Sequence, residues 1–107
     1  MIKFLVQARY TADGTKGLLK EGAIARRKAV EELMTSVGGK VEEFYFTFGV
    51  DDAILIVDLP NEETALAIAA TVRASGMIQS TMTRLIPVAE LERALEQHVK
   101  FRAPGSS

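Results

Sequence analysis

The order of two hydrophobic patterns along the chain constrains the fold more than any single motif does. Four segments alternate apolar and polar residues, or are almost continuously apolar, as strands are: 2–10, 41–48, 53–59 and 77–86. Two segments between them carry apolar residues at steps of three and four, at 18–37 and 61–75. The order strand, helix, strand, strand, helix, strand predicts an α+β domain with the ferredoxin-like βαββαβ fold.

The first crossover is expected to be one continuous helix. Asp13 or Thr15 suits its N-cap, and Gly38-Gly39 ends it. Its buried stripe is predicted to contain Leu18, Gly22, Ala25, Ala29, Leu33 and Val37. The second crossover helix has Asn61 as its N-cap and ends at Gly76. Its buried residues are expected to be Ala65, Leu66, Ile68, Ala69 and Val72.

Strand composition predicts the order of the sheet. The runs Phe4-Leu5-Val6 and Ala53–Val57 are the most continuously apolar, which is typical of central strands. The second and fourth strands carry Glu42, Glu43, Gln79 and Thr81, which suit the edges of a sheet. The first and third strands are therefore expected in the middle.

A short helix is expected after Pro87, with Val88, Leu91, Leu95 and Val99 along one side. Two crossover helices cover only one face of such a sheet, and strand 53–59 would show apolar side chains on the other. A second copy of the chain, related by a two-fold axis, would cover that face, so we expect a homodimer. The alternative is that the final helix folds back over its own sheet. We place a single domain at 1–100 and a flexible tail at 101–107.

Composition narrows the classes of function. The formal net charge is −1, so no basic field favours nucleic acid or an anionic membrane, and we expect neither as a partner. Cysteine is absent, which excludes disulfides and thiolate chemistry. The start of the chain carries Lys3, Gln7 and Arg9, which are too polar for a signal peptide core. We therefore expect a cytoplasmic protein.

The chain resembles the GYD-domain family, whose members are small dimeric α/β-barrel proteins of uncharacterised function. The matching residues are Tyr10-Thr11, Gly14, Gly17, Gly22, Arg26, Gly38-Gly39-Lys40, Tyr45, Gly49, Asp51, Pro60, Ser75-Gly76, Thr81 and Thr83. The chain departs from the pattern at Val50, where the family signature has its central Tyr. The resemblance implies a ferredoxin-like domain of the dimeric α/β-barrel type, here with an extra C-terminal helix. It also implies a cavity between sheet and helices or between protomers, and it implies no particular activity.

Nine residues are candidates for binding a ligand: Tyr10, Thr11, Gly14, Arg26, Tyr45, Gly49, Asp51, Thr81 and Thr83. The polar side chains among them suit a mostly apolar pocket with a few hydrogen-bonding groups, or equally a dimer interface. The segment 13–17, with two glycines and Lys16, could hold an anion or could be a simple turn. No metal site or cofactor is predicted, because His98 is the only histidine and the sequence has no cysteine to pair with it.

Arg26 and Asp51 are the charged candidates. Arg26 lies beside the apolar stripe, so it could pair with Asp51 or with a ligand carboxylate, or form a structural ion pair. Asp51 and Asp52 could act as a general base or bind a metal, or could serve as ordinary turn residues.

Three functions remain open on these residues, one of which is a structural or interaction protein whose sheet face serves only assembly. The first is a dimer that binds or senses a small molecule. The alternative is a cofactor-independent enzyme for a small carboxylated or aromatic substrate, which requires Tyr10, Arg26 and Asp51 to meet at one pocket. No catalytic residue is assigned.

Overall fold

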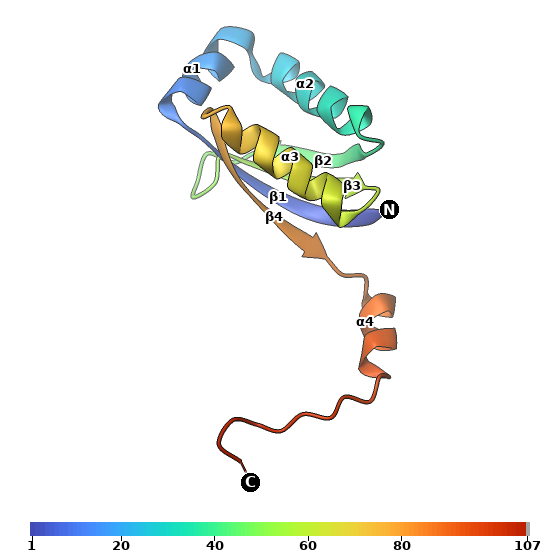
Figure 1. The fold of residues 1–107 in the computed structure, drawn as a ribbon. Coiled ribbons are helices and arrows are strands. Elements are labelled where there is room, and N and C mark those ends of the chain that lie inside the picture. Colours follow the sequence, from blue (N-terminus) through green and yellow to red (C-terminus); the bar gives the residue numbers. More distant parts are fainter. Residues whose placement is uncertain (107) are drawn as a thin grey trace.

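A computed structural model describes residues 1–106 and shows one four-stranded sheet with four helices (Figure 1). The elements in chain order are β1 (Ile2–Tyr10), α1 (Ala12–Glu21), α2 (Ala23–Ser36), β2 (Lys40–Phe46), β3 (Ala53–Leu59), α3 (Glu62–Ala74), β4 (Ile78–Leu85) and α4 (Val88–Leu95). The sheet order is β2-β3-β1-β4, and every neighbouring pair is antiparallel. The ferredoxin-like α+β fold is confirmed, with β1 and β3 in the middle as expected.

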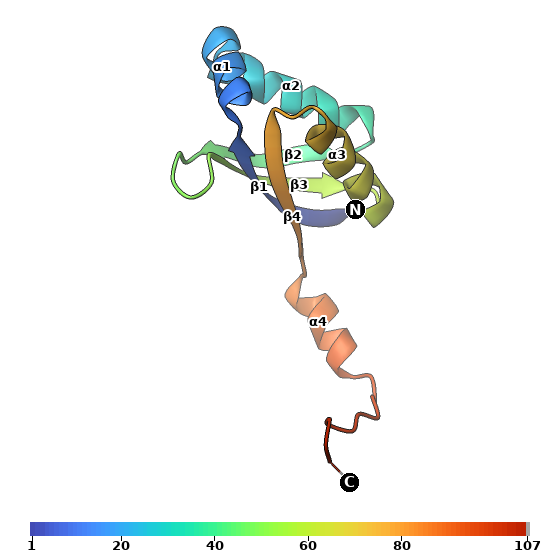
Figure 2. The same cartoon turned by 60° about the vertical axis from the view of Figure 1, so that its left-hand side comes forward.

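One face of the sheet holds the hydrophobic core, and we call it the covered face. Helices α1, α2 and α3 all lie on this side (Figures 1 and 2). Alternation places Phe4, Val6 and Ala8 of β1 there, beside Leu55, Val57 and Leu59 of β3; Val57 and Leu59 are 0% exposed. Met34 of α2 and Ala65 and Ile68 of α3 close the core from above. The opposite face of the sheet, which we call the open face, has no helix over it.

The first crossover is broken, in contrast to the single helix predicted for it. Gly22 separates α1 from α2 and has φ 89°, a conformation that favours glycine. The predicted N-cap, Asp13 or Thr15, was wrong: both lie inside α1, and Thr11 is the cap, since its side chain accepts a hydrogen bond from the Gly14 amide. The break shifts the helical phase, so Ala25 is exposed while Met34 is buried. Of the stripe predicted after Gly22, Ala25 was therefore wrong, whereas Ala29, Leu33 and Val37 are half-buried beside the core or the cavity.

The second crossover agrees more closely with its sequence pattern. The Asn61 side chain accepts a hydrogen bond from the Thr64 amide at 2.8 Å and caps α3, as predicted. Ala65 and Ile68 are buried, but Leu66 is 70% exposed, so its predicted burial was wrong. Leu66 directly follows a buried position, and a helix turns by about 100° per residue, which carries it away from the sheet.

Helix α4 leaves the body of the molecule instead of packing on it (Figures 1 and 2). The radius of gyration is 17.5 Å, against about 13 Å for a compact 100-residue domain, and the longest extent is 61 Å. None of the residues of α4 is buried. The final helix therefore does not fold back over its own sheet. It ends at Leu95, so Val99 and His98 lie beyond it, and the last residue of the expected tail 101–107 lies outside the described residues.

Candidate functional site

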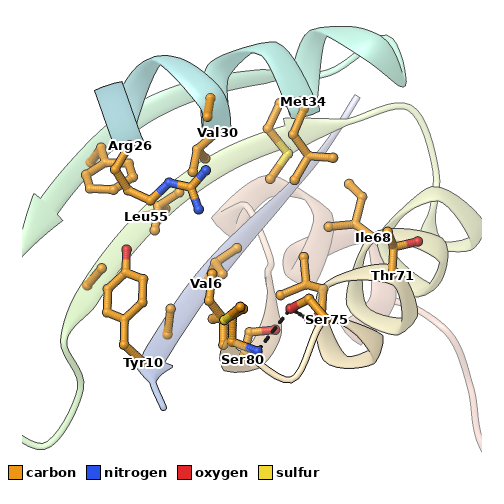
Figure 3. Close-up of a pocket in the computed structure, with 18 of the residues that line it drawn as sticks. Val6, Tyr10, Arg26, Val30, Met34, Leu55, Ile68, Thr71, Ser75 and Ser80 are labelled. Carbon is orange, nitrogen blue, oxygen red and sulfur yellow. Dashed lines mark hydrogen bonds between the residues drawn. The ribbon is translucent and has the colours of Figure 1, made fainter. Parts of the chain in front are cut away.

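A cavity of about 350 Å³ opens between the two long helices on the covered face (Figure 3). Helix α2 packs over the edge strand β2, and α3 packs over the other edge strand, β4. The central strands therefore form the floor of the cavity. There, Ala8 of β1 and Ala53 of β3 lie directly opposite each other in the sheet register. Two alanines side by side leave space that larger side chains would fill.

The walls of the cavity are mainly apolar and come from all four strands and from helices α2 and α3. Val6, Leu55 and Phe44 rise from the strands, and Val30, Met34 and Ile68 descend from α2 and α3. Polar groups lie at a few places only, which are Tyr10, Arg26, Thr71, Ser75 and Ser80. An apolar cavity of this volume with few polar groups is typical of small-molecule sites in proteins.

Arg26 is the only charged residue among those that line the cavity. It projects from the first turn of α2, and its guanidinium points into the cavity (Figure 3). Its Nε lies 2.9 Å from Oε1 of Glu21, yet the N–H is not aligned with that oxygen, and this buried Nε has no hydrogen-bond partner. Buried polar groups are almost always hydrogen-bonded, so an orphaned guanidinium N–H needs an explanation.

Tyr10 faces Arg26 from the end of β1, and its hydroxyl also points into the cavity (Figure 3). Burial raises the pKa of the Tyr10 phenol, and the positive charge of Arg26 only partly opposes this effect. The phenol is therefore neutral at physiological pH. A neutral phenol beside a guanidinium offers a second hydrogen-bond donor toward the same volume.

Two of the other polar side chains are already engaged locally. Ser75 donates to the Val72 carbonyl at 2.6 Å and accepts from the Met77 amide at 3.1 Å. Thr71 donates to the Ala67 carbonyl at 2.8 Å. These contacts leave Tyr10, Arg26 and the hydroxyl of Ser80 as the side-chain donors toward the cavity.

The open face brings together different charged residues. Asp51 accepts from the Gln7 side chain at 3.0 Å and lies 3.4 Å from Nε of Arg9. At the other end of this face, Lys3 contacts both Asp58 and Glu42. Burial acts to raise the pKa of Asp58, but its neighbours Glu42 and Lys3 outweigh burial and hold that pKa below its ordinary value.

The nine candidate residues therefore do not form one site. Tyr10 and Arg26 share the cavity, and with Gly14 they also line a neighbouring hollow of about 160 Å³. Asp51 lies on the open face, so the pairing of Arg26 with Asp51 that the sequence allowed does not form. The register of the strands places Tyr45, Thr81 and Thr83 on the open face as well.

Thr11, Gly14 and Gly49 have local structural positions. Thr11 caps α1 and also donates to the Gly76 carbonyl at 2.9 Å. A Cβ on Gly14 would lie 2.0 Å from the Met77 carbonyl oxygen, so this glycine permits α1 to approach the start of β4. The segment 13–17 is helical and not an anion-binding loop. Gly49 lies in the β2–β3 loop, with open space around its Cα.

The sequence did not identify some of the residues that line the cavity. Val30, Met34, Ser75 and Ser80 line the cavity, but none was a candidate. A signal was present for α2: once the helix is restarted after Gly22, the core-facing positions become Arg26, Ala29, Val30, Leu33 and Met34. In that phase, Arg26 lies on the stripe itself and not beside it.

Two features are absent from residues 1–106. No group of three or more His, Asp or Glu side chains there is placed to hold a metal ion. Within the same residues, no helix is both long enough and apolar enough to cross a membrane.

Comparison with known proteins identifies the family. The family model described as the GYD domain matches residues 4–95, which is most of the chain. The chain belongs to the GYD-domain family. No curated protein matches this GYD-domain chain.

A solved structure shows the same fold as this GYD domain. The crystal structure of MtbAldR superposes with a TM-score of 0.53 at 19% sequence identity, over 96% of this chain. The chain spans 57% of the length of that structure, and at this identity the likeness concerns the fold alone. It agrees with the ferredoxin-like assignment.

Proposed function

We propose that this GYD domain binds a small, largely apolar molecule with a carboxylate group in the cavity between its sheet and helices. The observation that carries the proposal is the guanidinium of Arg26, which points into an apolar cavity with a buried N–H that has no hydrogen-bond partner. A bound carboxylate would supply that partner in the two-pronged geometry that suits arginine.

The remaining features of the cavity agree with such a ligand. Tyr10 adds a neutral donor next to Arg26, so two donors converge where an anion would lie. The alanine floor and the aliphatic walls suit a hydrocarbon or aromatic tail, whose burial provides roughly 25 cal/mol per Å². The volume of about 350 Å³ suits a small metabolite and is too small for a macromolecular segment.

Binding is favoured over catalysis because no catalytic set meets at the cavity. The enzyme alternative required Arg26, Tyr10 and Asp51 together, and Asp51 engages Gln7 and Arg9 on the open face. Arg26 and Tyr10 provide recognition of an anion but no general base.

The proposal includes a homodimer. The open face carries Leu5, Tyr45, Ile54 and Ile56 in neighbouring positions of the sheet register, where each would meet water in a monomer. A second copy related by a two-fold axis would bury the same residues on both protomers.

The test is a binding screen with paired probes. Benzoate, phenylacetate and hexanoate are each compared with the corresponding uncharged primary amide, by thermal shift and calorimetry. We expect an acid to raise the melting temperature by several degrees, since ligand at 100 times its Kd adds about 2.7 kcal/mol of stability. The amides should bind at least tenfold more weakly.

Two arginine variants of the same helix make the test specific. Arg26→Met should abolish the thermal shift, while Arg27→Met should leave it unchanged, because Arg27 is exposed and pairs with Glu31 at 3.5 Å. Equal binding of acid and amide, or equal binding by the two variants, would refute the proposed site. Native mass spectrometry of the same samples reports the dimer and any retained ligand.

A further inference from the structure

The C-terminal arm, residues 86–101, is the part of the molecule with the most unpartnered apolar surface. Val88 is 85% exposed, Leu91 50% and Leu95 70%. The arm has these exposed large apolar residues: Ile86, Val88, Leu91, Leu95, Val99 and Phe101. Steps of three and four residues place Val88, Leu91 and Leu95 on one side of α4, so the exposed surface is a continuous stripe. Such a stripe on a soluble chain marks a docking surface.

The arm is held away from its own domain. Only two residues separate β4 from α4, and the second is Pro87, whose φ is −59°. Across this short link, Arg84 contacts both carboxylate oxygens of Glu90, at 2.9 Å and 2.8 Å. Both contacts are made by one guanidinium nitrogen, Nη2, and this ion pair joins the end of β4 to the first turn of α4. The arm therefore continues outward from β4, as both views show (Figures 1 and 2).

The same chain offers a matching surface elsewhere, which we call the sheet patch. It consists of Leu5, Tyr45, Ile54 and Ile56 on the open face; Leu5 pairs with Ile56, and Tyr45 pairs with Ile54. These four residues alone are few against the roughly 20–30 per side of a stable interface. The arm supplies what is missing, and in a two-fold dimer each copy gives one arm and receives another.

The charges of the arm argue against other occupants. Helix α4 carries Glu90, Glu92 and Arg93, and Glu96 follows it, so the polar side is mainly acidic. Helices that lie on membrane surfaces carry lysine and arginine on that side, since the lipid headgroups are anionic. Nucleic acid is disfavoured for the same reason.

We infer that the apolar stripe of α4 packs on the sheet patch of a second copy of this chain. In the resulting dimer, the C-terminal arm of each copy packs on the sheet of the other. The inference rests on the dimer contained in the proposed function and adds which segment makes the contact. It does not depend on the ligand of the cavity.

Dimer dissociation constants, measured by analytical ultracentrifugation on the full chain, test this contact. Leu91→Lys puts a charge in the stripe, and the matched control Ala89→Lys puts the same charge on the opposite side of α4. Two copies of the contact are lost per dimer, so we expect Leu91→Lys to raise the dissociation constant by tenfold or more. Ala89→Lys should change it less than about twofold, as surface substitutions do.

The location of the docked arm is tested with a spin label. The natural chain has no cysteine, so Glu92→Cys takes a single nitroxide beside the stripe. This protein is mixed with ¹⁵N-labelled wild type, and broadening of amide signals then reports contacts between copies. We expect broadening at Tyr45 and Ile54, and none from a label at Lys28→Cys on the exposed side of α2.

The outcomes separate the two proposals. A wild-type dimer that Leu91→Lys and Ala89→Lys weaken equally, or in which the Glu92 label broadens no sheet-patch signal, overturns the exchanged arm and leaves the dimer intact. A wild-type chain that is monomeric at every concentration overturns both the arm and the dimer. Neither result bears on acid binding in the cavity, which the Arg26 variants test separately.

Discussion

The two faces of the sheet differ in whether their charged side chains have hydrogen-bond partners within the chain. On the open face, Asp51 is matched by Gln7 and Arg9, and Lys3 is matched by Asp58 and Glu42. On the covered face, Arg26 is directed into an apolar cavity. Its Nε lies 2.9 Å from Oε1 of Glu21, but this buried N–H is not aligned with that oxygen and has no hydrogen-bond partner.

This difference between the faces distinguishes charged groups that stabilise the fold from a charged group that can still bind a ligand. An ion pair that is satisfied within the chain has little left to offer a ligand, whereas an unsatisfied buried donor gains a full hydrogen bond when a ligand arrives. The open face is accordingly a surface for assembly, in our proposal, and the covered face is a site for binding. Three predictions test this contrast.

The largest effect is expected from truncation of the covered-face core. Leu59 is fully buried at the end of β3, so Leu59→Ala should lower the free energy of unfolding by about 2–5 kcal/mol. Ile56→Ala on the open face of the same strand should cost much less in a dilute sample, and its cost should grow with protein concentration as the dimer forms. Chemical denaturation at two concentrations measures both. Equal costs for the two variants would contradict the distinction between the faces.

A smaller effect on stability, but a decisive one on binding, is expected from filling the cavity. Ala53 forms part of its floor, so Ala53→Leu would direct the added side chain into empty space. Stability should change by less than about 1.5 kcal/mol, because little has to move. Affinity for the acid probes should fall by tenfold or more in calorimetry. If Ala53→Leu binds like wild type, the ligand does not occupy this cavity.

The smallest effect is a pH dependence that differs between the faces. The pKa of Asp58 is held below its ordinary value, so its stabilising contribution is present above about pH 4 and is lost as the pH falls through the folded pKa. The pKa of Tyr10 is raised, so its contribution is present below about pH 10 and is lost as the pH rises through the folded pKa.

The variants Asp58→Asn and Tyr10→Phe separate these two titrations. Asp58→Asn should remove part of the loss of stability in acid and leave the alkaline limb unchanged. Tyr10→Phe should do the reverse. Thermal melting across the pH range is the measurement, and a change in the wrong limb for either variant would contradict the assigned environment.

Much of the fold follows from local pattern. The continuous apolar runs of 4–6 and 53–57 identified the central strands, and alternation grouped the side chains of each strand by face, because a strand has a period of two residues. The Asn61 cap and the βαββαβ order were also predicted correctly from the sequence. The GYD signature residues indicated the family from the amino-acid sequence alone, and the family match over residues 4–95 confirms it.

The residues of the candidate site were harder to predict from the sequence, because one glycine changes how a helix is positioned. Gly22 has two possible uses, as a small residue within a helix or as a break with positive φ, and only the packing of α1 and α2 selects the second. That choice restarts the helix, adds Val30 and Met34 to its core-facing side, and turns Arg26 from the margin of the stripe into the cavity. The sequence allowed Asp51 to pair with Arg26, yet its carboxylate contacts Gln7 and Arg9 on the other face of the sheet.

The sequence by itself thus determined the strands, the Asn61 cap and the two apolar sheet faces, because these depend on residues close together in the chain, and its signature residues indicated the family. Only the tertiary structure decided which polar groups share a cavity and which are matched elsewhere, because those distances depend on how separate elements pack. The same holds for α4. Its amphipathic pattern was visible in the residues, but its direction away from the sheet depends on Pro87 and on the contact between Arg84 and Glu90.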